Sequence, residues 1–68
     1  MRYAIVIEGS PGNYSAYAPD LPGCVSVGET RDEVVEAMKE AIQFHLDGLR
    51  EDGLPIPEPA SLIEYVEL

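Results

Sequence analysis

The sequence predicts an α+β domain in which three antiparallel strands precede one helix and a final strand follows it (β-β-β-α-β). Two observations lead to this prediction. Residues 30–52 hold the only long helical pattern of the 68-residue chain, and short apolar runs bounded by Gly and Pro lie on both sides of it. A chain of this length forms one small domain, so residues 1–68 are expected to fold together.

Three strands are predicted before the helix. Arg2 to Glu8 carries apolar residues on both parities, which is typical of a central strand. The turn residues 10–13 separate it from a second strand, Tyr14 to Ala18, which alternates aromatic and small residues. Residues 19–23 then break the ladder with two prolines and a glycine, and Cys24 to Val27 forms a short third strand.

The helix is predicted from Thr30 to Asp52 by its end signals and its periodicity. Thr30 and Glu33 form a capping box, with Glu33 reaching back to the amide of Thr30, while Gly53 and the following proline end the helix. One broad stripe is apolar, and Phe44 lies off it, toward the acidic side. The stripe contains Val34, Val35, Met38, Ala41, Ile42, His45, Leu46 and Leu49.

A final strand is predicted over Ser61 to Glu67, after a connector in which three prolines are spaced two apart. The strands carry apolar residues on both parities, yet one helix covers only one face of a sheet. The second apolar face needs a second cover. We therefore expect a homo-oligomer, a dimer or a tetramer, or a protein partner.

Charge and cysteine content narrow the classes of partner. Thirteen acidic against four basic residues give a net charge of −9, which favours a basic partner and disfavours direct binding to nucleic acid or anionic membranes. An acidic surface that serves only solubility is the simpler alternative. The single cysteine excludes an internal disulfide, and the apolar run near Met1 is too short for a signal peptide or a membrane span, so the chain is expected to be cytoplasmic.

No catalytic, metal or cofactor site is predicted. His45 lies in the apolar stripe, where a structural histidine is commoner than a general base, and Cys24 has no neighbouring cation to activate it. Asp20 is expected to cap its own turn. Few carboxylates in or beside the predicted strands are candidates for metal binding, and their spacing forms no metal-binding pattern: Glu8, Asp20, Glu64 and Glu67.

The motif Asp20-Leu21-Pro22-Gly23-Cys24, followed by Gly28-Glu29-Thr30, Glu33 and the connector over residues 53–59, resembles the HicB-like antitoxins of toxin-antitoxin pairs. The resemblance implies a partial ribonuclease H-like fold without the catalytic carboxylates of that enzyme. It also implies that the chain binds a small basic toxin that cleaves RNA and covers its active site. Many members continue into a DNA-binding domain, whereas this sequence stops at Leu68, so we expect a short form that does not contact DNA.

The leading hypothesis is therefore a non-catalytic antitoxin that neutralises a small basic ribonuclease. Its partner is expected to contact the acidic side of the helix, at Glu36, Glu40, Phe44 and Asp47. An alternative is an orphan dimeric binding module with an unknown ligand and no cognate toxin. A third, weaker reading is a small hydrolase that uses strand carboxylates such as Glu8 or Asp20.

Overall fold

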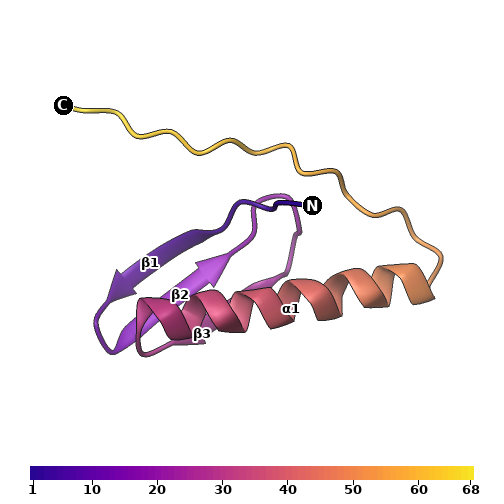
Figure 1. Ribbon diagram of the computed structural model, residues 1–68, viewed down its shortest axis with the longest axis horizontal. Coiled ribbons are helices and arrows are strands. Elements are labelled where there is room, and N and C mark those ends of the chain that lie inside the picture. Colours follow the sequence, from indigo (N-terminus) through magenta and orange to yellow (C-terminus); the bar gives the residue numbers. More distant parts are fainter.

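A computed structural model describes residues 1–68 as one sheet and one helix. Strands β1 (Val6–Ser10), β2 (Asn13–Tyr17) and β3 (Val25–Gly28) are antiparallel in the order β1-β2-β3. Helix α1 (Arg31–Glu51) lies across the sheet (Figure 1). The predicted α+β fold, with a three-stranded antiparallel sheet followed by a helix, is confirmed.

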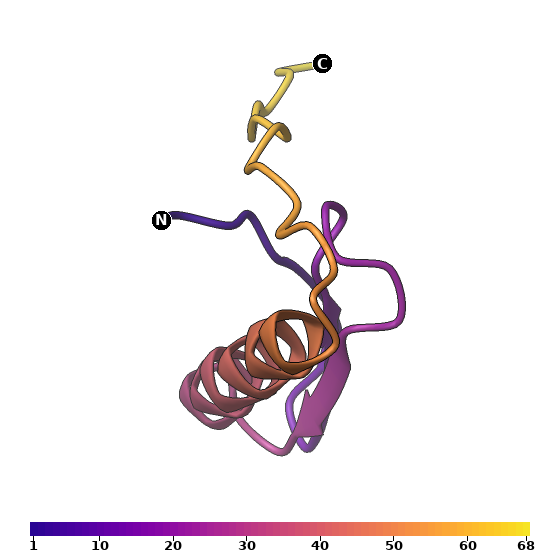
Figure 2. The same cartoon turned by 90° about the vertical axis from the view of Figure 1, so that its right-hand side faces the viewer.

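The register of the sheet separates a covered face from an open one. Ala16 pairs with Ile7 on one side and Ser26 on the other, and its side chain is buried on the face that α1 covers. The neighbouring row, Val6–Tyr17–Val25, points the opposite way because side chains alternate along a strand. Figure 2 shows α1 on one side of the sheet only. The other face therefore has no cover within the chain.

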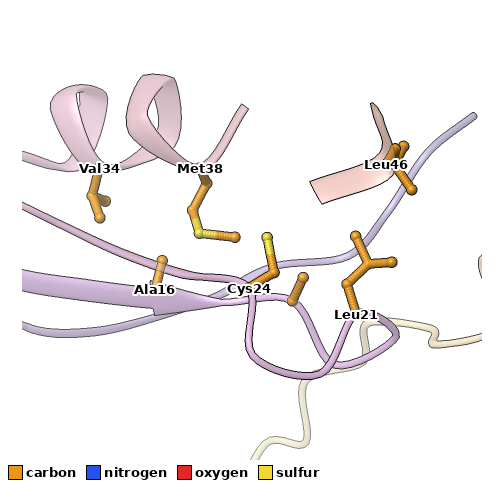
Figure 3. Packing of buried hydrophobic residues seen from close by; sticks show 7 residues of the cluster. Ala16, Leu21, Cys24, Val34, Met38 and Leu46 are labelled. Carbon is orange, nitrogen blue, oxygen red and sulfur yellow. The ribbon is translucent and has the colours of Figure 1, made fainter. Parts of the chain in front are cut away.

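The hydrophobic core lies between α1 and the covered face of the sheet. Val34, Met38 and Leu46 point from the helix toward the sheet and the loop that precedes β3 (Figure 3). Each such large side chain contributes about 1.5–3 kcal/mol when fully buried. The complete core is small, with seven buried residues: Ala16, Ala18, Leu21, Cys24, Val34, Met38 and Leu46.

Both predicted ends of α1 are confirmed by their hydrogen bonds. The Thr30 hydroxyl accepts a hydrogen bond from the Glu33 amide at 3.1 Å. The Glu33 carboxylate reaches back as predicted, but to the Glu29 amide at 3.0 Å rather than to that of Thr30. At the other end, Gly53 has a φ of 69° and the amides of Gly53 and Leu54 donate to carbonyls of the last turn, which is a Schellman motif.

The helix begins close against β3 because position 28 is a glycine. A Cβ atom at Gly28 would lie 2.8 Å from the backbone nitrogen of Val34. The missing side chain thus allows a two-residue connection, Glu29 and Thr30, between strand and helix. This close approach sets the first turn of α1 directly on the sheet.

Two predictions about the strands are wrong. The first strand is an edge strand rather than a central one, because β1 has a neighbour only in β2. The final strand predicted over Ser61 to Glu67 is not formed, because no strand of the same chain supplies it with ladder hydrogen bonds. Residues 54–68 instead form an extended segment that leaves the body (Figures 1 and 2), which we call the arm. The likeness to ribonuclease H stays a prediction.

Candidate partner-binding surface

The four residues predicted to contact a partner lie on one face of α1. Glu36, Glu40, Phe44 and Asp47 are all exposed. At 100° per residue, their spacing places them within an arc of roughly 80° on the helix surface. This arc lies away from the stripe that holds Val34 and Met38, so the structure brings the four together on the solvent side.

Phe44 is the most conspicuous of the four because 83% of its surface is exposed. It borders a shallow groove of about 460 Å³ between α1 and the start of β3, with His45, Gly48 and Val25 among the lining residues. Apart from the adjoining backbone of α1 itself, no atom lies within 4 Å of the position that a Cβ would take at Gly48. An aromatic side chain beside an open, partly apolar groove is typical of an interaction site.

The unpaired negative charge of this face lies at Glu36 and Glu40. Asp47 forms an ion pair with Arg50 at 3.2 Å, and both side chains are more than half exposed. No ion pair involves Glu36 or Glu40. These two carboxylates therefore present uncompensated charge to a basic partner, whereas the charge of Asp47 is partly offset.

The loop between β2 and β3 holds the motif residues in structural roles. Leu21 is fully buried, and the Cys24 amide donates to its carbonyl at 3.1 Å. Gly23 has a φ of 83°, which an L-residue rarely adopts, while Pro22 lies exposed beside it. Burial raises the pKa of the Cys24 thiol, which disfavours the reactive thiolate.

Asp20 ties the arm to this loop, so the prediction that it caps its own turn is wrong. Its carboxylate accepts hydrogen bonds from the amides of Ala60 and Ser61, each at 3.0 Å, and from the Ser61 hydroxyl at 2.8 Å. The amides of Ser61 and Ala60, followed by that hydroxyl, hold the pKa of Asp20 below its ordinary value. Sequence reasoning missed this contact because forty residues separate the partners.

The side chains considered for catalysis are not assembled into a site. No three His, Cys, Asp or Glu residues lie close enough together to hold a metal ion. His45 is half-buried on the flank of α1, and the Asp20 carboxylate is engaged by the arm. The chain also contains no helix that is long and apolar enough to cross a membrane.

Comparison with known proteins decides the family. Residues 3–67 match the family described as HicB-like antitoxin of bacterial toxin-antitoxin systems. The chain belongs to the HicB-like antitoxin family. The predicted resemblance is thus confirmed over nearly the whole length.

Relatives of this HicB-like chain come from a phage, an archaeon and bacteria. A phage HP1 protein of Haemophilus, described as uncharacterized, is 39% identical over 66 residues, which are 97% of this chain and 50% of that protein. A UPF0150 protein of Archaeoglobus fulgidus is 43% identical over 56 residues, which are 78% and 81% of the two chains. Antitoxin HicB of Escherichia coli K12 is 36% identical over 63 residues, or 91% and 46%. The chain thus spans about half of the phage protein and of the E. coli antitoxin.

Proposed function

We propose that this chain is a non-catalytic antitoxin that binds a small basic ribonuclease toxin and covers its active site. Membership of the HicB-like family supports a toxin as the partner. The observation that carries the binding site is Phe44, which is 83% exposed on a helix face that also presents Glu36 and Glu40. A toxin that cleaves RNA acts where RNA is, so the proposal places the chain in the cytoplasm.

The two parts of this surface have different tasks. Uncompensated carboxylates attract a basic protein over several ångströms and speed its encounter, an effect that salt screens. An exposed aromatic ring that enters a pocket of the partner slows dissociation, because its apolar surface is then removed from water. We therefore assign association mainly to Glu36 and Glu40 and residence mainly to Phe44.

Occlusion needs no chemistry from the antitoxin itself. In the proposal, the carboxylates of the acidic face act through charge complementarity with the basic toxin. The net charge of −9 also opposes the approach of RNA, which protects the covered active site from its substrate. Direct binding of the chain to nucleic acid has no part in the proposal.

A pull-down from lysate of the source organism tests the proposal. Tagged chain is expected to retain a small basic protein in near-equal amounts, to release it as salt rises, and to suppress its RNA cleavage. Phe44→Ala is expected to weaken capture by about 2 kcal/mol or more. Val35→Ala, at another exposed apolar residue of α1 outside the acidic arc, is the matched control and should capture normally.

Charge reversal tests whether the acidic face of α1 speeds association with the toxin. Glu40→Lys should slow association with the captured toxin at low salt, whereas Glu58→Lys changes the net charge equally on the arm and should have a smaller effect. Equal association rates for the two variants would contradict the assigned face. Recovery of the bait alone, as a stable oligomer, would favour an orphan binding module instead.

A further inference from the structure

The outer edge of β1 and residues 61–67 both lack a hydrogen-bonding neighbour. β1 is paired with β2 alone, and residues 61–67 have no ladder partner in the chain. The sequence of the first strand nevertheless has the apolar pattern of a central strand on both parities. An open edge of this kind is a template for a further strand.

The outer part of the arm has the residue composition of a strand, but its large apolar side chains are mostly exposed to solvent. Leu62, Tyr65 and Val66 are 94%, 88% and 80% exposed, and Ile63 is half exposed. Aromatic and β-branched residues at these positions favour extended, paired backbone. So many large apolar side chains in one short segment need a cover that the single chain does not provide.

The base of the arm is fixed by hydrogen bonds to the body. Asp20 binds the backbone at Ala60 and Ser61, and the Tyr3 hydroxyl donates to the carbonyl of Pro57. Beyond this anchor a gap of about 520 Å³ separates the arm from β1, lined by Ile5 to Gly9 on one side and Leu62 to Tyr65 on the other. No ladder hydrogen bond joins the two sides. The anchored arm is thus not paired with its own β1 (Figures 1 and 2).

An apolar groove lies where an added strand would place its side chains. The groove has a volume of about 740 Å³ and runs between α1 and the segment that leads into β1. Tyr3 and Ile5 line one wall, and Met38 and Ile42 line the other. α1 packs over β2 and β3, and the groove lies beside the residues that precede β1. Every second side chain of a strand added along this edge would point to the same face as α1 and border the groove.

We propose that residues 61–67 of one copy pair with the free edge of β1 in a second copy, and that the exchange is reciprocal. Every chain carries both the donor segment and the acceptor edge, so one two-fold axis satisfies both and closes the assembly. Ladder hydrogen bonds stabilise the contact, and alternate side chains of the incoming segment fill the groove beside Met38. This assembly stands independently of toxin binding.

Sedimentation equilibrium on the full chain and three variants tests the proposal. The full chain is expected to have twice its 7.4 kDa mass at micromolar concentration. Val66→Pro removes a ladder donor and should raise the dissociation constant by about tenfold or more. Val66→Thr keeps the amide and the β-branched shape, so it should stay dimeric. Because Val66 is exposed in the single chain, circular dichroism should show both variants folded.

A third variant distinguishes the edge of the sheet from its open face. Val27 lies 75% exposed on the face opposite α1, so Val27→Lys should leave the dimer intact. Dissociation by Val27→Lys together with a dimeric Val66→Pro would overturn the proposal in favour of face-to-face packing. A full chain that remains monomeric at all concentrations would overturn it as well.

Discussion

The body of the molecule, residues 6–51, and the arm, residues 54–68, differ in how far they bury their apolar side chains. The body encloses its apolar side chains between α1 and the sheet, with Leu21 and Val34 fully buried. The arm is richer in apolar residues than the body but leaves Leu62 and Tyr65 almost entirely in solvent. It is attached near its base, by Asp20, by the Tyr3 hydroxyl and by the packing of Ile56 against the core. The body thus buries its core within one chain, whereas the arm depends on the proposed strand exchange for its cover.

The largest expected effect lies in the body. Met38 is 1% exposed, so Met38→Ala should lower the free energy of unfolding by about 2–5 kcal/mol through lost burial and a cavity. Leu62→Ala in the arm should change it by less than about 0.5 kcal/mol at low protein concentration, where the chains are separate. Urea unfolding followed by circular dichroism measures both. Similar losses of unfolding free energy for the two variants would contradict the difference between body and arm.

Substitution of two glycines of the body by alanine is expected to change the free energy of unfolding in opposite directions. Gly28→Ala would force a Cβ against the first turn of α1 and should destabilise the chain by about 1–3 kcal/mol. Gly48→Ala adds a methyl group to an open position within the helix and should stabilise it by about 0.5–1 kcal/mol. Thermal unfolding of the two variants beside the parent chain measures these shifts. A stabilising Gly28→Ala would contradict the close contact between β3 and α1.

The smallest expected effect concerns the base of the arm and depends on pH. The pKa of Asp20 is lowered from 3.8 by the hydrogen bonds from Ser61 and Ala60. The attachment therefore keeps its full strength above about pH 4 and is lost as the pH falls through the lowered pKa. Amide NMR signals of Ala60 and Ser61 should follow this titration. In Asp20→Asn, which cannot titrate, they should not; a titration that persists would assign the change to another group.

The elements that could be predicted from the sequence are those determined by residues close together in the chain. Both ends of α1 follow from residues within one turn, Thr30 with Glu33 and Gly53 with the proline after it, so the helix was predicted within a residue at each end. The position of Phe44 on the acidic face likewise follows from helical periodicity alone. Local chemistry therefore predicted the helix, its exposed face and three strands, although the first strand begins at Val6 and not at Arg2.

The features that sequence reasoning missed depend on contacts between distant parts of the chain. The hydrogen bond from the Ser61 amide to the Asp20 carboxylate joins residues that are forty-one positions apart, and no local sequence pattern predicts it. The apolar pattern of the first strand predicted a central strand, but β1 is an edge strand with β2 as its one neighbour in the chain. The apolar pattern of a strand shows which of its faces are apolar, but it does not show whether the same chain or another molecule packs against them.

Hydrogen–deuterium exchange across a range of protein concentrations tests the contrast between body and arm most directly. Amides of β2 and α1 should be protected at every concentration, because their hydrogen bonds lie within one chain. Amides of residues 61–67 should exchange freely in dilute protein and become protected as the concentration rises into the dimeric range. Protection of residues 61–67 that is absent at every concentration, or equally strong in the most dilute sample, would contradict the account.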